Sequence, residues 1–101
     1  MDKFPKFIIE DDCLILAKVS YHKNLVTDKA KVKGGGWFRF VQETNTFIFH
    51  GDSQDFGKAK MEDIQKCITL GNVFSNIYQT HSIAGKHNFA YDTGTEIINL
   101  S

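Results

Sequence analysis

Residues 36–49, GWFRFVQETNTFIF, alternate between two faces so regularly that they constrain the fold more than any other segment. Side chains along a strand point to opposite sides in turn, so Phe38 and Phe40 share one face while Trp37 and Arg39 share the other. The ETNT tetrapeptide between the two runs is typical of a turn. The segment therefore predicts a β-hairpin in which Phe38 and Phe40 face the core. The three glycines at its start predict a close approach to a neighbouring loop.

Other segments predict two further hairpins and one helix. Residues 6–21, KFIIEDDCLILAKVSY, hold two apolar runs joined by an acidic turn, and two strand-like pieces near the C-terminus are separated by DTG. Apolar residues recur at helical spacing from Met61 to Ile68, and Gly71 is a natural left-handed stop. A helix is therefore predicted at about residues 58–70. The polar residues 22–33 predict a loop with at most a helical turn.

A chain of 101 residues can bury one modest core, so a single domain spanning residues 1–101 is expected. The mixture of hairpins with one helix predicts an α+β fold. We expect a small single-domain sandwich with an antiparallel-rich mixed sheet.

The charge balance argues against nucleic acid as a partner. Twelve Lys and Arg residues match twelve Asp and Glu residues, so no overall positive field would attract a polyanion. The run KGGGWFRF overlaps an RNA-binding sheet motif, but Gly35 stands where that motif needs an aromatic residue to stack a base. No apolar run is long enough to span a membrane, and residues 1–12 do not form a signal peptide. We expect a soluble, cytoplasmic protein with no membrane contact.

No metal ion or other cofactor is expected. The four histidines, His22, His50, His81 and His87, lack the spacing to each other, to cysteines or to carboxylates that metal sites use. Cys13 and Cys67 lie far apart in apolar segments and form no Cys-x-x-Cys motif. Reduced, buried thiols are the expectation for both.

Residues 50–59, HGDSQDFGKA, have the outline of an anion pocket. A strand ends, a short loop carries Gly51, Ser53 and Gly57, and a helix is predicted to begin near Lys58. Such a loop can aim backbone N–H groups and a hydroxyl at an anion over the helix N-terminus. The same residues also suit a plain turn in which Ser53 or Asp55 caps the helix. Both interpretations stay open at this point.

Taken together, three motifs resemble the janus/ocnus family of phosphohistidine-phosphatase-like proteins. They are the glycines at 34–36, the Gly-x-Ser-x-x-Phe-Gly-x-Ala run at 51–59 and the Tyr-His pair that ends at His22. The similarity covers residues 21–68. It implies a small α/β sandwich that transfers phosphoryl groups without a metal.

The resemblance also implies roles for individual residues. His22 is the implied catalytic residue, because a neutral imidazole is a competent nucleophile or base near pH 7. The implied phosphate-binding residues are Gly51, Ser53, Asp55, Gly57 and Arg39. The implied partners are a phosphorylated protein or another phosphate-bearing ligand.

This chain departs from the family pattern at two positions of that site. Trp37 stands where the family has an arginine, with Arg39 two residues on along the same face, and Asp55 stands where the family has an alanine. The nearest candidate for a family lysine near the first strand is Lys18. The alternative hypothesis is therefore a non-catalytic protein-interaction module, an inhibitor or regulatory adaptor, that binds a protein partner through Trp37, Arg39 and Tyr78.

Overall fold

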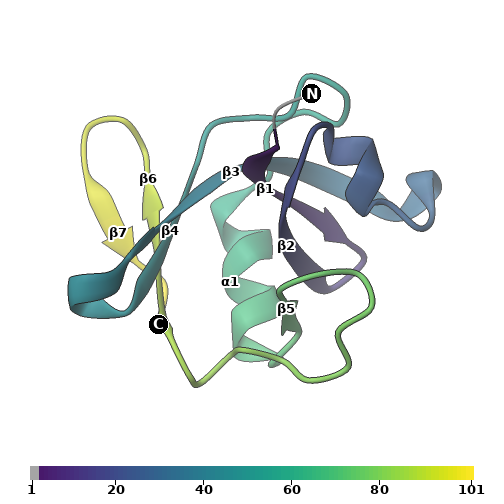
Figure 1. The fold of residues 1–101 in the computed structure, drawn as a ribbon. Helices are drawn as coiled ribbons and strands as arrows, with labels where there is room; N and C mark the ends of the chain where they lie inside the picture. The colour runs from purple at the N-terminus through teal and green to yellow at the C-terminus, as the bar shows by residue number, and fades with distance from the viewer. Residues whose placement is uncertain (1–2) are drawn as a thin grey trace.

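Seven strands form one curled sheet in the order β5-β2-β1-β3-β4-β6-β7, with helix α1 between its two halves (Figure 1). The computed structural model describes residues 3–101. The strands are β1 (Phe4–Glu10), β2 (Cys13–Val19), β3 (Val32–Val41), β4 (Thr46–His50), β5 (Val73–Phe74), β6 (Asn88–Asp92) and β7 (Ile97–Asn99). The helices are α1 (Met61–Thr69) and three short 3-10 turns, η1 (His22–Leu25), η2 (Lys29–Lys31) and η3 (Gln42–Thr44).

All three predicted hairpins are confirmed. The pairs β1–β2, β3–β4 and β6–β7 are antiparallel, and β1 also pairs antiparallel with β3. Two pairs, β2–β5 and β4–β6, are parallel, so the sheet is mixed and rich in antiparallel pairs. The fold is α+β and dominated by strands. The expected sandwich is not confirmed, because all seven named strands belong to one sheet.

The helix begins three residues later than predicted. Residues 58–60 are extended: Lys58 forms a β-bridge with Gly35, and the side chain of Ala59 is buried. α1 therefore covers Met61–Thr69 rather than about 58–70. Its predicted end is confirmed, because Gly71 has φ +75° and its N–H donates a hydrogen bond to the carbonyl of Ile68 at 3.0 Å.

The main core lies between α1 and the concave face of the sheet. It contains Phe7, Ile9, Leu14, Leu16, Phe49, Ala59, Ile64, Cys67, Val73, Phe89, Tyr91 and Leu100. A smaller cluster on the other face of β1 and β2 contains Ile8, Ile15 and Leu25. The continuous apolar runs of β1 and β2 follow from this arrangement, because both faces of these two strands are covered.

β3 begins at Val32, four residues before the alternating segment, and includes the glycine triplet. A Cβ atom added to Gly34 would lie 2.8 Å from Cα of Ala59, and one added to Gly35 would lie 2.6 Å from the carbonyl oxygen of Phe7. The expected close approach is therefore confirmed. Phe38 packs against the main core as predicted, but Phe40 is 44% exposed, so its prediction was wrong. Phe40 covers Phe47 near the far end of the strand instead.

Residues 22–33 contain η1, η2 and the start of β3, so they are more ordered than the predicted loop. η1 packs on β1 and β2 and brings His22 against the sheet. Among residues 3–101, no helix has the length and apolar character that crossing a membrane requires.

Candidate functional site

His22 lies at a pocket of about 550 Å³ where η1, β1, β3 and the loop after β4 meet. The pocket is lined by Lys6, Ser20, Tyr21, His22, Trp37, Asp52, Gln54 and Asp55. Lys6 and Trp37 are paired across β1 and β3, so both side chains project from the same face of the sheet. The pocket thus combines a lysine, an imidazole, two carboxylates and two aromatic rings.

The fold sets the orientation of the His22 ring. Its Nε2 lies 2.7 Å from the carbonyl oxygen of Gly36, and a carbonyl can only accept a hydrogen bond. In the neutral ring the proton therefore sits on Nε2, and Nδ1 keeps its lone pair. Nδ1 has no hydrogen-bond partner among residues 3–101. It is not completely buried, because every fully buried polar side-chain atom of these residues has a partner.

The surroundings of His22 favour the neutral imidazole. The side chain is only 5% exposed, because Gly35 leaves room for it: a Cβ atom on Gly35 would lie 3.2 Å from its Cδ2. Burial lowers the pKa of His22 below 6.5, and the nearby charge of Lys6 lowers it further, whereas the hydrogen bond to Gly36 and the charge of Asp55 oppose the shift. A neutral ring with a free Nδ1 can act as a nucleophile or as a base.

Lys6 is the pocket residue that the sequence analysis missed. It is 6% exposed, and its ammonium donates a hydrogen bond to the carbonyl of Ser20 and lies 4.8 Å from the ring centroid of Trp37. The rings of Phe4 and Tyr21 each lie 5.9 Å away. No carboxylate among the described residues lies within 4.0 Å of this ammonium. A buried cation without a counter-ion, at the wall of a pocket, is suited to an anionic ligand.

The available signal for Lys6 was a lysine directly after Pro5 inside an apolar strand, β1. Its importance depends on the pairing with Trp37, which lies 31 positions along the chain, and local patterns do not reveal such a pairing. Lys18, the candidate chosen from the sequence, is exposed on β2 and does not line the pocket.

Most of the amides expected to form a phosphate cradle are already paired, either within the loop or with β3. The N–H of Ser53 donates to the carbonyl of Gly35 at 3.1 Å, and the N–H of Gly57 donates to the carbonyl of Ser53 at 2.9 Å. The hydroxyl of Ser53 accepts a hydrogen bond from the N–H of Phe56 at 3.2 Å and is part of a 2% exposed residue. Ser53 and Gly57 thus stabilise the loop against β3 and do not line the pocket.

The other predicted phosphate-binding residues, Gly51, Asp55 and Arg39, do not lie in one pocket. Asp55 lines the pocket of His22, whereas Gly51 lines a neighbouring pocket of about 480 Å³ together with His50 and Lys58. Arg39 lines neither pocket, and its guanidinium donates to the Asp92 carboxylate at 3.1 Å. The late start of α1 also moves the helix N-terminus away from the loop, since residues 58–60 lie between them.

The three predicted partner-binding residues do not form one patch. Trp37 is partly buried in the wall of the pocket, and its ring lies 6.0 Å from that of His22 at nearly a right angle. Tyr78 is 86% exposed in the segment after β5. Its neighbours Ile77 and Gln79 line a different cavity, at the opposite end of β1.

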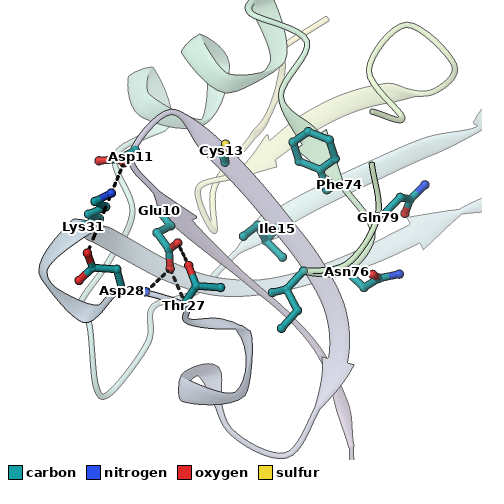
Figure 2. A pocket seen from close by; sticks show the side chains of 11 residues that line it. Glu10, Asp11, Cys13, Ile15, Thr27, Asp28, Lys31, Phe74, Asn76 and Gln79 are labelled. Carbon is teal, nitrogen blue, oxygen red and sulfur yellow. Dashed lines mark hydrogen bonds and ion pairs between the residues drawn. The ribbon is translucent and has the colours of Figure 1, made fainter. Parts of the chain in front are cut away.

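That second cavity is shown in Figure 2 and has a volume of about 290 Å³. Ile15, Phe74 and Ile77 line its apolar part. The carboxylate of Glu10 accepts hydrogen bonds from the Thr27 hydroxyl and from the amides of residues 27 and 28. The polar groups at this rim are thus largely paired with one another, which distinguishes this cavity from the pocket of Lys6 and His22.

The described residues contain no group of three His, Cys, Asp or Glu side chains placed to hold a metal ion. Both cysteines are free thiols, and Cys67 is fully buried in α1 while Cys13 is partly buried. Burial raises the pKa of the Cys67 thiol to about 12, so this group is a packing residue rather than a nucleophile.

Comparison with known proteins adds nothing to the geometry: no protein-family model matches the chain, and neither does a curated protein or a solved structure.

Proposed function

We propose that the pocket of Lys6 and His22 binds a phosphoryl group and that His22 transfers it without a metal, as in phosphohistidine phosphatases. The observation that carries the proposal is the buried ammonium of Lys6, which shares a pocket with a neutral imidazole and has no carboxylate partner among the described residues. The relationship to the janus/ocnus family, and the sandwich fold that it implies, belong to the same proposal.

The reaction would take place in two steps. Nδ1 of His22 attacks phosphorus, the bond from phosphorus to the leaving group breaks, and the leaving group takes a proton from solvent. Nε2–H stays hydrogen-bonded to the Gly36 carbonyl, which stabilises the positive charge that forms on the ring. Water then attacks phosphorus, the N–P bond breaks, and phosphate leaves with the imidazole restored.

Lys6 would stabilise the oxygens of the transferring group. Its Ser20 hydrogen bond uses one of the three ammonium protons, so two remain for a ligand. Phosphoryl transfer depends mainly on positioning and on charge stabilisation, and a buried ammonium supplies both. Ser53 and Gly57 have an indirect role in this proposal, because they hold the loop that carries Asp55.

The alternative, a non-catalytic interaction module, is favoured by half-exposed aromatic rings in and beside the same pocket. Phe4 and Tyr21 are each almost half exposed, and the ring of Phe4 lies 6.0 Å from that of Trp37. Exposed aromatic side chains around a partly buried tryptophan are typical of residues that dominate protein–protein binding.

A phosphatase assay with matched variants tests the proposal. Wild-type protein should release phosphate from a phosphohistidine-bearing peptide, and His22→Gln should abolish release because glutamine keeps a donor toward Gly36 but lacks the nucleophilic Nδ1. Lys6→Met should reduce the rate by about 100-fold or more, as expected for a lost charge-stabilising group. His81→Gln, which changes an exposed histidine outside the pocket, should have no effect.

NMR titration with inorganic phosphate separates the two functions. If phosphate shifts the amide signals of residues 22, 37, 54 and 55 but no turnover is seen, the protein binds phosphate without hydrolysing a substrate. If folded wild-type protein neither releases phosphate nor shows these shifts, the proposal is contradicted. Capture of a protein partner that is lost in Trp37→Ala would then support the interaction module.

A further inference from the structure

The charges that line the Lys6–His22 pocket favour a ligand with charges of both signs over a bare phosphate ion. Lys6 contributes one positive charge, whereas Asp52 and Asp55 contribute two negative charges. An isolated dianion at this site would be attracted by the ammonium and repelled by both carboxylates. The composition of the pocket therefore indicates a ligand that carries charges of both signs.

The two carboxylates are free to take part in binding. No hydrogen bond or ion pair involves the side chain of Asp52 or Asp55 among residues 3–101, and both residues are exposed. Asp11, Asp12, Asp28 and Asp92, in contrast, each pair with a lysine or an arginine. Asp63 on α1 also lacks such a partner within the described part of the chain, but of these three unpaired carboxylates only Asp52 and Asp55 line the pocket and are available to a ligand there.

The positive and negative groups are held apart. Lys6 is fixed on β1 by the Ser20 carbonyl and by the rings of Trp37 and Tyr21, so it cannot swing across to neutralise the carboxylates without losing these contacts. Asp52 and Asp55 belong to a different element, the loop after β4, and neither carboxylate lies within 4.0 Å of the Lys6 ammonium. His22 lies within reach of both groups, since the charges of Lys6 and Asp55 act on its ring in opposite directions.

We propose that this pocket selects a zwitterionic ligand, in which a phosphoryl group bound by Lys6 is joined through a few bonds to an ammonium or guanidinium group bound by Asp52 and Asp55. This inference rests on the proposed function and specifies its substrate class. Two sources share this chemistry: a small aminoalkyl phosphate, and a phosphorylated peptide with a basic side chain next to the phosphorylated residue. Asp52 and Asp55 are then the residues that set specificity.

The test compares matched probes by NMR titration of the whole chain. O-phosphoethanolamine should bind wild-type protein about fivefold or more tightly than ethyl phosphate, which has the same phosphoryl group and no amine. The double variant Asp52→Asn/Asp55→Asn should bind the two probes about equally. Its affinity for ethyl phosphate should be higher than that of the wild-type protein, because both negative charges are gone. Asp63→Asn, a carboxylate on α1 outside the pocket, is the control and should keep the wild-type preference.

The outcomes separate this inference from the function on which it rests. The inference of a zwitterionic ligand is overturned if wild type binds both probes equally, or if the double variant keeps the wild-type preference. Either result is still compatible with binding of a phosphoryl group. No binding of either probe overturns the proposed function itself. Ethanolamine alone binding as tightly as O-phosphoethanolamine would also overturn the inference, because the phosphoryl group would then contribute nothing.

A second pair of probes distinguishes the two sources. Under the inference, a phosphoserine peptide with an adjacent arginine should bind more tightly than the same peptide with alanine there. If that peptide also binds more tightly than O-phosphoethanolamine, the natural ligand is a phosphorylated protein; if it binds less tightly, the ligand is a small molecule.

Discussion

At the level of single residues, the position of His22 depends on the absence of one side chain, that of residue 35, and on one backbone carbonyl. Gly35 leaves room for the imidazole, and the carbonyl of Gly36 accepts the hydrogen bond that fixes its tautomer. Lys6 and the burial of the ring then keep the neutral form dominant. The glycine triplet thus contributes to the site through the space and the backbone acceptor that it provides.

The lowered pKa of His22 predicts how stability changes with pH. The unfolded chain takes up a proton near pH 6.5, whereas the folded chain does so only at lower pH, so the unfolded state binds more protons between these two values. The contribution of His22 to the free energy of unfolding should be complete above pH 6.5 and should decrease as the pH falls toward the pKa of the folded state.

NMR titration of the ring and urea unfolding at pH 7.5 and pH 5.5 check this prediction. His22→Gln should show a smaller loss of stability at pH 5.5 than wild type. His50 also has a pKa lowered by burial, so His50→Gln shows how much of the remaining loss comes from the second ring. A ring of His22 that titrates at or above pH 6.5 would contradict the argument.

At the level of elements, residues with strong local signals were predicted well. The three hairpins were predicted from the turn at residues 10–12, from the DTG turn and from the alternation after Gly36. The end of α1 was predicted from Gly71. The start of α1 could not be predicted, because a long-range bridge between Lys58 and Gly35 holds that segment extended. The two parallel strand pairs, β2–β5 and β4–β6, could not be predicted either, because each joins strands that lie far apart in the sequence. β5, with two residues, is also too short to have a pattern of its own.

The left-handed backbone of Gly71 predicts a measurable cost for any side chain at the end of α1. Gly71→Ala should lower the free energy of unfolding by about 1–2 kcal/mol, because an L residue is strained at positive φ although nothing lies within 4 Å of the added Cβ. Gly71→Asn should cost less, since asparagine tolerates this conformation better. Urea denaturation measures both, and equal costs for the two variants would argue against strain as the cause.

At the level of the whole molecule, the candidate site combines residues that are distant in the sequence. His22 and Asp55 were expected together only through the family resemblance, and Lys6 joins them through the register between β1 and β3. Ser53 and Gly57 were expected in the pocket, yet their polar groups complete the backbone pairing of the loop. A motif can locate such a loop, but which of its N–H groups remain free depends on the strand that it packs against.

Unfolding of the whole chain should be a single cooperative transition in which the pocket and the sheet unfold together. Trp37, the chain's one tryptophan, lies both in central strand β3 and in the wall of the pocket, so its fluorescence reports on the sheet and the site together. Urea transitions followed by this fluorescence and by far-UV circular dichroism should superimpose, as two-state unfolding of one domain requires. A fluorescence change at lower urea would mean that the pocket opens first.

The same measurement links the site to global stability. A ligand that binds only the folded state raises the free energy of unfolding in proportion to the logarithm of its concentration above Kd. O-phosphoethanolamine at about 100 times its Kd should therefore stabilise wild type by about 2.7 kcal/mol and shift both transitions equally. Lys6→Met should show no shift, because the buried ammonium that holds the phosphoryl group is gone. A shift that persists in Lys6→Met would place the binding site elsewhere on the molecule.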